Sequence, residues 1–163
     1  MGIPSYGYNH RDVFTGAGQI LNLCKELDVD TVAGPATSGV VIAMACFMRS
    51  RRWKRSIKAM LLEKRGYERA KHNPGPKLLG EGPVKNILVV DDCVASGESF
   101  LHAINEAERS VYGGRVVACA TSTWWRSAVD LILDRFPWMK FYSVGKSVAE
   151  YKRNQGNYRG VTL

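Results

Sequence analysis

The stretch Asn86-Ile-Leu-Val-Val-Asp-Asp-Cys-Val-Ala-Ser-Gly-Glu-Ser-Phe100 decides the fold expected for this chain of 163 residues. Its four apolar residues, 87–90, predict a buried strand that ends in two adjacent carboxylates, Asp91 and Asp92. A turn of small residues follows, and a helical pattern begins at Glu98. Ligands of open α/β sheets bind at the carboxyl ends of the strands. The stretch therefore predicts a ligand site at one edge of a sheet.

The turn after the two acids has the composition of a phosphate site. The backbone N–H groups of residues 96–99 and the hydroxyls of Ser96 and Ser99 suit a phosphate at a helix N-terminus, where the helix dipole favours negative charge. Asp91 and Asp92 suit sugar hydroxyls or the water shell of Mg²⁺. Because these acids would repel a bare phosphate, the pattern favours a ligand with a sugar beside its phosphate. The alternative is that the acids only end a strand and Ser-Gly only caps a helix.

This segment resembles the phosphoribosyl pyrophosphate signature of the type I phosphoribosyltransferases. It has the same four apolar residues, two acids, three variable residues and Ser-Gly turn closing in a hydroxyl residue. The resemblance implies that Asp91 and Asp92 act in catalysis and hold Mg²⁺ through ligand and water. It also implies a substrate-binding turn made of Ala95, Ser96, Gly97, Glu98 and Ser99.

Strand and helix patterns alternate along the chain, which predicts an α/β fold with a parallel sheet and helices on both faces. The expected strands are residues 30–33, 57–62, 87–90, 115–121 and 141–144. The expected helices are residues 11–27, 40–48, 98–111 and 127–136; the second is apolar on every side and is expected to be buried. Residues 64–82 are rich in charge, Gly and Pro and are expected to form a flexible loop. We expect one domain over residues 1–163, with its core at about 28–145.

A second turn of small residues, Gly34-Pro-Ala-Thr-Ser-Gly39, joins the first expected strand to the apolar helix. It is similar to the pyrophosphate loop of the orotate phosphoribosyltransferases in particular. That likeness implies substrate contacts from Pro35, Ala36, Thr37, Ser38 and Gly39. The orotate enzymes usually carry a Lys in this loop where this chain has Ser38, which removes a charge contact to pyrophosphate. Taken alone, Gly-Pro before a helix is common turn chemistry.

The charged segment 64–80 resembles the mobile catalytic loop of the orotate enzymes. By that resemblance, Lys71 and His72 close over the site and neutralise the departing pyrophosphate, because cations on a lid stabilise a charged leaving group and exclude water. The family places an acid between the Lys and the His, whereas here the two are adjacent. The alternative for His72 is an ordinary solvated loop residue.

The part of the chain that would read a nucleobase departs from the orotate enzymes. Only about 28 residues precede the first expected strand, whereas those enzymes usually have a longer N-terminal extension that forms a hood over the base. Trp124, Trp125 and Arg126 are the nearest candidates for stacking on a base. Their alternative is packing against the C-terminal strand or a second subunit.

The net charge of +8 fits two classes of protein, one that binds nucleic acid and one that handles a small, highly phosphorylated substrate. Much of it lies in two runs, Arg49, Arg51, Arg52, Lys54 and Arg55, then Lys152, Arg153 and Arg159. No stretch reaches the roughly 18 apolar residues of a membrane span, and no secretory signal is recognisable. The four cysteines lack metal-like spacing, which favours reduced packing residues in a cytoplasmic protein.

These features together predict a phosphoribosyltransferase that transfers ribose 5-phosphate from phosphoribosyl pyrophosphate to a nucleobase. Orotate is the first expectation and a purine the second, with Mg²⁺ as cofactor, a homodimer, and no membrane or nucleic-acid partner. The alternative is a non-catalytic sensor of the same ligand that binds nucleic acid or protein. The short N-terminal region, Ser38 and the positive charge favour the sensor, whereas Lys71 and His72 favour the enzyme.

Overall fold

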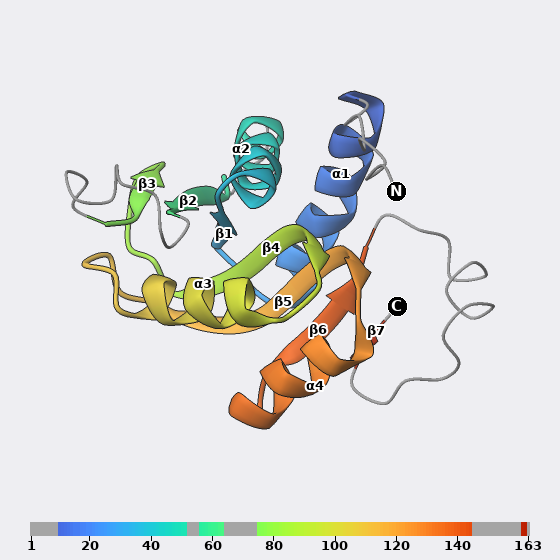
Figure 1. Ribbon diagram of the computed structural model, residues 1–163. Coiled ribbons are helices and arrows are strands. Elements are labelled where there is room, and N and C mark those ends of the chain that lie inside the picture. Colours follow the sequence, from blue (N-terminus) through green and yellow to red (C-terminus); the bar gives the residue numbers. More distant parts are fainter. Residues whose placement is uncertain (1–9, 52–55, 64–74, 145–160, 163) are drawn as a thin grey trace.

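The computed structural model describes residues 10–51, 56–63, 75–144 and 161–162 (Figure 1). Within them lies a seven-stranded sheet of order β3-β2-β1-β4-β5-β6-β7. All its neighbouring strands are parallel except β2 and β3. The strands are β1 Thr31–Pro35, β2 Lys58–Leu62, β3 Lys77–Leu79, β4 Asn86–Val94, β5 Arg115–Trp124, β6 Lys140–Ser143 and β7 Val161–Thr162.

Helices cover both faces of this sheet, as the alternating patterns predict. They are α1 His10–Glu26, α2 Ser38–Ser50, α3 Glu98–Glu108 and α4 Arg126–Arg135. Figure 1 shows α1 and α2 on one side of the sheet and α3 and α4 on the other. No helix in the described part of the chain is long and apolar enough to cross a membrane.

Side chains of the central strand β4 belong to two hydrophobic cores, one on each face of the sheet. Ile87 and Val89 pack with α3 and α4, whereas Leu88 and Val90 pack with α1 and α2. All four side chains are fully buried, because successive residues of a strand point to opposite faces and both faces are covered. Each contributes about 1.5–3 kcal/mol to stability by leaving water. The centre of the sheet therefore requires apolar side chains at all four positions, 87–90.

An ion pair at the amino ends of the strands aligns β1, β2 and β4. Asp30 lies 3.3 Å from the Lys58 ammonium, and both residues are buried. The Asp30 carboxylate also accepts the Thr31 hydroxyl at 2.9 Å and the Lys85 backbone N–H at 3.1 Å. Because β1 and β4 are parallel neighbours, the turns that follow them lie at the same carboxyl edge of the sheet.

At one edge of the sheet a predicted boundary is wrong, and at the other edge the structure has a strand that no sequence pattern indicated. Residues 77–79, within the predicted loop 64–82, form β3 and pair antiparallel with β2, with Met60 opposite Leu78. A strand of three residues at an edge has too few alternating positions to be recognised from the sequence. The short strand β7 was likewise not predicted, and it extends the sheet beyond β6.

Two predictions about helices are also wrong. The helix predicted to be buried all round has an outward face, since Val41 is 46% and Met48 60% exposed. The helix expected to reach Val111 ends at Glu108, and Val111 is 94% exposed. Hydropathy records the side-chain type alone, so an apolar residue on an outward face is indistinguishable from a core residue.

The burial of three of the four cysteines agrees with the prediction that they are packing residues. All four are free thiols; Cys24, Cys46 and Cys119 are buried, and Cys93 is half-buried.

Candidate functional site

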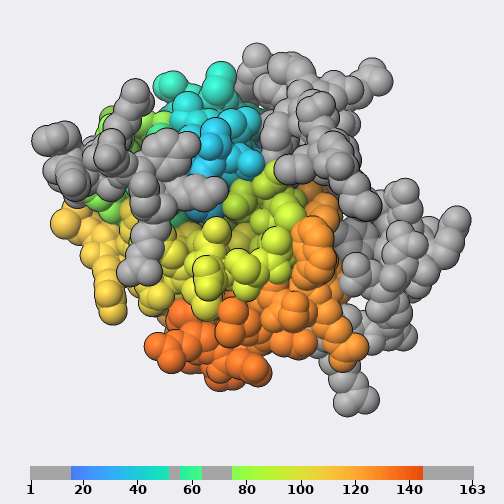
Figure 2. Space-filling view, in the orientation of Figure 1, coloured from blue at the N-terminus to red at the C-terminus, as the bar shows by residue number. Residues whose placement is uncertain are grey.

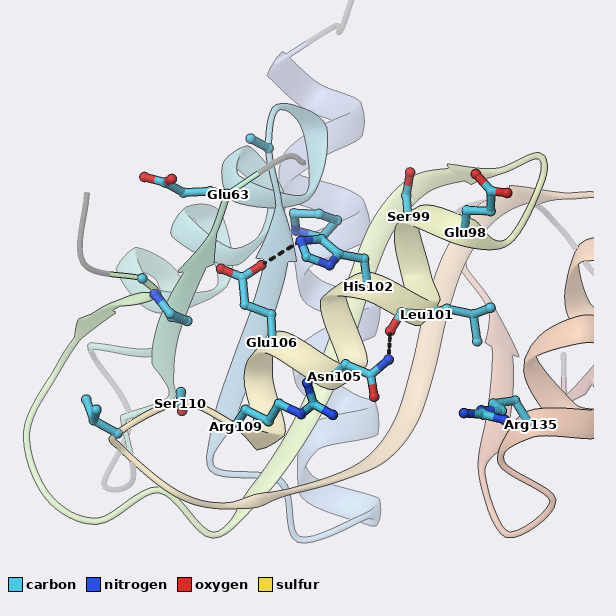
Figure 3. Close-up of a pocket in the computed structure, with 15 residues that line it drawn as sticks. Glu63, Glu98, Ser99, Leu101, His102, Asn105, Glu106, Arg109, Ser110 and Arg135 are labelled. Carbon is cyan, nitrogen blue, oxygen red and sulfur yellow. Dashed lines mark hydrogen bonds and ion pairs between the residues drawn. The ribbon is translucent and has the colours of Figure 1, made fainter. Parts of the chain in front are cut away.

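The two turns of small residues meet at the carboxyl edge of the sheet. Pro35 and Ala36, at the end of β1, and Glu98 and Ser99, at the start of α3, line one open cavity of about 960 Å³ (Figure 3). In the space-filling view the yellow-green atoms around residues 95–99 lie between those of α2 and those of α4 (Figure 2). The structure thus brings together two segments that lie about 60 residues apart in the sequence.

Two glycines shape the turn between β1 and α2. A Cβ built on Gly34 would collide with the carbonyl of Gly39, and one built on Gly39 would lie 2.6 Å from the carbonyl oxygen of Val90. The turn is therefore folded back on itself and rests directly on β4. Its Ala36–Thr37 peptide is cis, and the Ala36 N–H donates to the Leu62 carbonyl at 3.0 Å. Of the predicted contacts here, Thr37 is exposed and Ala36 and Ser38 are half-buried, whereas Pro35 and Gly39 are buried.

The turn between β4 and α3 leaves its polar groups accessible. Ala95, Ser96, Glu98 and Ser99 are exposed. Gly97 is buried, with φ +84°, a conformation that glycine adopts at little cost. The Ser96 hydroxyl accepts the Glu98 backbone N–H at 3.4 Å. An accessible helix N-terminus with hydroxyls beside it is a suitable anion site.

The two acids lie within β4 and do not follow it, which corrects the predicted strand end. Pairing with β5 continues past them to Val94, and the Ser122 hydroxyl donates to the Asp92 carbonyl at 2.7 Å. Both side chains are half-buried. Apolar character ends at residue 90, but backbone pairing does not, so hydropathy alone places the strand end too early.

The environment of Asp91 favours its protonated form. Burial is the largest cause that raises the pKa of its carboxyl, the nearby charge of Asp92 also raises it, and the net value is about 7. The backbone N–H groups of Asp92 and Gly39 oppose the rise, because they stabilise the carboxylate. The Asp92 N–H donates to Asp91 Oδ1 at 2.9 Å. Asp91 is thus linked to the turn that precedes α2.

The candidates for stacking on a base separate into a buried and an exposed group. Trp124 is only 4% exposed and belongs to the same core cluster as Phe141 of β6, so its prediction as a stacking residue is wrong and the packing alternative holds. Trp125 is 53% exposed, and its backbone N–H donates to the Val94 carbonyl at 2.9 Å. Arg126 is exposed and lies 4.0 Å from Asp130.

The remaining predicted catalytic residues, Lys71 and His72, lie outside the described residues.

The cavity continues along α3 past residues that the sequence did not single out. His102 Nε2 lies 3.5 Å from Glu106 Oε2, and Figure 3 shows both on the face of α3 that turns toward Glu63. Burial raises the pKa of Glu106, while the Glu63 backbone N–H and His102 lower it. The i, i+4 spacing of His102 and Glu106 was the only sequence signal for this pair. Neither Asp91 nor Asp92 is among the described residues that line the cavity.

The donor set at the acids suits a magnesium ion shared with a ligand. In the described residues, no group of three or more His, Cys, Asp or Glu side chains is arranged to hold a metal. Mg²⁺ commonly needs only one or two carboxylates, with phosphates and waters completing its shell. Asp91 and Asp92 supply two carboxylates, which are half-buried and lie beside the two turns.

Comparisons with known proteins agree on the fold. No protein-family model and no curated protein matches the chain. The orotate phosphoribosyltransferase of Mycobacterium tuberculosis, solved in complex with 5-phospho-α-D-ribosyl 1-diphosphate, superposes with a TM-score of 0.60 at 23% identity, over 82% of this chain and 73% of that one. A phosphoribosyltransferase from Corynebacterium diphtheriae gives 0.61 at 21% identity, over 82% and 78% of the two chains. The orotate phosphoribosyltransferase of Francisella tularensis gives 0.58 at 18% identity, over 82% and 66%.

Proposed function

We propose, from the type I phosphoribosyltransferase fold of this chain and its similarity to the orotate enzymes, that the protein is a phosphoribosyltransferase. It transfers ribose 5-phosphate from phosphoribosyl pyrophosphate to a ring nitrogen of a nucleobase and releases pyrophosphate. One observation carries the proposal: both small-residue turns open on the same cavity, and one of them packs at Gly39 against the carbonyl of Val90, the residue before Asp91. The similar M. tuberculosis enzyme was solved with this phosphoribosyl ligand.

Each segment has a separate role in the proposed reaction. The turn Ala95–Ser99 binds the 5-phosphate, because its exposed hydroxyls and helix N-terminus suit a dianion. Residues 35–39 bind pyrophosphate, and the acid pair serves the ribose hydroxyls between the two. Asp91 and Asp92 would hold Mg²⁺ through the ligand and water, and the ion would supply positive charge near the leaving pyrophosphate.

The leaving group also needs cations from this chain. We assign that role to Lys71 and His72, because Ser38 supplies no charge in the turn where the orotate enzymes usually carry a Lys. The nucleobase is orotate in our first proposal and a purine in our second. The exposed ring of Trp125, which directly follows β5, remains a candidate for stacking on the base.

We further propose that the protein is a single-domain cytoplasmic homodimer. The outward apolar side chains Val41 and Met48 lie seven residues apart on α2, and thus on one face, as a subunit interface would need. Light scattering at micromolar concentration distinguishes the dimer from the monomer. A monomer would contradict this part of the proposal and leave the activity untouched.

A sensor of phosphoribosyl pyrophosphate is the second candidate function. The neutral Ser38 favours the sensor. A turn without a cation can bind the ligand, but it assists cleavage of the ligand poorly. A sensor would also use the net charge of +8 to bind nucleic acid, with an affinity that falls steeply as salt rises. Sub-micromolar binding to a defined RNA or DNA at physiological salt, without pyrophosphate release from any base, would favour this candidate over the enzyme.

The decisive experiment incubates the protein with phosphoribosyl pyrophosphate, Mg²⁺ and each common free base, and measures released pyrophosphate. We expect release with orotate or, failing that, with a purine. The control is the double variant Asp91→Asn, Asp92→Asn, which should fold and be inactive. Release that is equal in the variant and the wild type would show a contaminating activity and contradict the assignment.

A further inference from the structure

The amino edge of the sheet, opposite the edge that holds the candidate site, carries a row of exposed cations. Lys85 comes directly before β4, Arg115 begins β5 and Lys140 begins β6. These strands are neighbours in the sheet, about 4.8 Å apart from one to the next. The Arg115 backbone N–H donates to the Lys85 carbonyl at 2.8 Å, which holds these two residues side by side. In the described part of the chain, none of the three cations forms an ion pair with an acid.

Two aromatic side chains lie among these cations. Trp138 is 53% exposed, and the guanidinium carbon of Arg115 lies 5.9 Å from the centre of its ring. The Phe136 ring meets the Trp138 ring edge to face, with 5.6 Å between their centroids, which restrains the tryptophan. Tyr112 is 39% exposed and belongs to the turn that leads from α3 into β5 (Figure 1). That turn rests on the start of β4, because a Cβ built on Gly114 would lie 2.6 Å from a side chain that precedes the strand.

Three acids border this row of cations. Glu108 is half-buried, and its carboxylate accepts the Val116 backbone N–H at 3.1 Å. Asp134 is exposed on α4. Toward β1 the edge becomes acidic, since Asp28 is exposed and its carbonyl accepts the Asn86 side chain at 3.1 Å. The positively charged surface therefore crosses β4, β5 and β6 and ends before β1.

We propose that this amino-edge surface, made of Lys85, Tyr112, Arg115, Trp138 and Lys140, binds a single-stranded nucleic acid. The cations contact successive phosphates, and the two exposed rings stack on bases. Proteins hold single strands without sequence preference by this combination of a positive track and aromatic rings. Each base presents a flat face to a ring, so the surface accepts different sequences.

Other occupants match the amino-edge surface less well. A second copy of this chain on a two-fold axis would bring like charges together. An acidic protein segment would neutralise the cations, but carboxylates offer no flat face to the rings. A mononucleotide would need a concave site, as small ligands do, and none of the five residues lines the described cavity. A strand instead gains its affinity from several contacts spread over a flat surface.

The amino-edge surface reverses the expectation of no nucleic-acid partner. Its cations come from the starts of three strands that lie 25 or more residues apart in the chain, so they form no run in the sequence. Neither of the two basic runs, at 49–55 and 152–159, contributes a residue to it. Only the side-by-side arrangement of the strands brings the cations together.

Fluorescence anisotropy with a labelled oligothymidine of about 16 nucleotides tests the stacking role. Trp138→Ala should weaken binding at least about fivefold, because it removes a stacked base. Trp138→Phe keeps a ring and should stay within about twofold of the wild type. The matched control is Trp125→Ala. Trp125 is also 53% exposed, but it follows β5 at the carboxyl edge, and its removal should change the affinity less than about twofold. Equal losses in the two alanine variants, or a wild type that does not bind, would overturn the proposal.

The salt dependence of the same affinity tests the row of cations and does not require the tryptophan variant to fold. Arg115→Gln combined with Lys140→Gln removes two phosphate contacts, so the slope of log affinity against log salt should become shallower by about 1.4. The control combines Lys77→Gln with Arg126→Gln, which removes the same charge from exposed residues outside the amino-edge surface. It should leave the slope as it is. Equal changes in both double variants would show general attraction to a basic protein and overturn the proposal.

Three further measurements separate the other occupants from a nucleic acid strand. Polyglutamate that binds as tightly as the oligothymidine would identify an acidic protein as the partner. Thymidine monophosphate that binds as tightly would identify a site for a small ligand. Self-association that is seen by light scattering and lost in Trp138→Ala would identify a subunit interface. Each of these results would overturn the proposal, whereas weak binding of both probes by a monomeric surface would support it.

The proposal is independent of the proposed function, because the amino-edge surface and the candidate site lie at opposite edges of the sheet. Trp138→Ala should therefore release pyrophosphate at the rate of the wild type. A wild-type protein that releases no pyrophosphate with any base would refute the transferase and leave the oligothymidine result unaffected.

Discussion

Gly97, at the start of α3, faces the carbonyl oxygen of Ala128 in α4: a Cβ built on Gly97 would lie 3.0 Å from that oxygen and 3.4 Å from a methyl of Leu131. The turn proposed to bind phosphate thus packs against α4, which lies about 30 residues later in the chain. Its shape depends on α4 as well as on its own sequence. Any side chain at position 97 would push the turn away from α4.

Substituting this glycine should therefore damage both stability and phosphate binding. Gly97→Ala places a Cβ at φ +84° and against Ala128, which should cost about 2–3 kcal/mol in the free energy of unfolding. Urea denaturation measures the stability, and calorimetry with ribose 5-phosphate measures the affinity. Gly113→Ala is the control, because Gly113 also has positive φ, +70°, but no described atom lies within 4 Å of an added Cβ. It should lose about 1 kcal/mol and bind as the wild type does. Equal losses in the two variants would show that backbone conformation, and not the contact with α4, makes Gly97 necessary.

The turn before α2 should tolerate no side chain at Gly34. The Cβ of Gly34→Ala would collide with the backbone of Gly39, which no rotamer change relieves, so we expect a loss of at least about 3 kcal/mol or failure to fold. Thermal unfolding by circular dichroism measures this. Gly16→Ala in α1 is the control: an added Cβ there meets no described atom within 4 Å, and the change should raise stability by about 0.5–1 kcal/mol. A Gly34→Ala variant as stable as the wild type would contradict the close packing of the two glycines.

The buried ion pair at the amino ends of the strands should be costly to break on one side. Lys58→Met leaves the Asp30 carboxylate without its ammonium partner at 3.3 Å, and we expect a loss of about 3–5 kcal/mol. Urea denaturation is again the measurement. The control is Asp130→Ala, which removes the exposed pair with Arg126 and should change stability by less than about 0.5 kcal/mol. Similar effects of the two variants would mean that burial does not strengthen the inner pair.

The raised pKa of Asp91 predicts a specific dependence of stability on pH. Its carboxyl titrates at about 7 in the folded protein and near 3.8 in the unfolded chain, so between these values the folded state binds more protons. Its contribution to stability is present below about pH 4 and is lost as the pH rises toward 7. Between pH 4 and pH 8 this titration should lower the free energy of unfolding of the wild type by roughly 1–3 kcal/mol. Asp91→Asn stays neutral and should not show this decrease. Denaturation curves of wild type and variant between pH 4 and pH 8 check this; two parallel pH profiles would contradict the shifted titration.

The sequence by itself determined the fold class and most of its elements. The apolar run 87–90 fixed a strand buried on both faces, because only a central strand of a parallel sheet needs apolar residues at every position. The alternation of strand and helix patterns then fixed the layers, since parallel strands require crossover helices. Both small-residue turns were visible for the same reason: Gly, Pro and Ser mark places where the backbone leaves regular structure.

Only the tertiary structure decided which of those residues meet and in what state. The position of Asp91 beside Gly39, and the contact of Gly97 with α4, join segments distant in the chain, and no local pattern records such contacts. Trp124 is buried in the core, whereas Trp125, the next residue and identical in type, is exposed. The sequence gives the chemical type of each side chain directly. Its exposure, its pKa and the pairing of distant turns arise from packing, which depends on all the elements together.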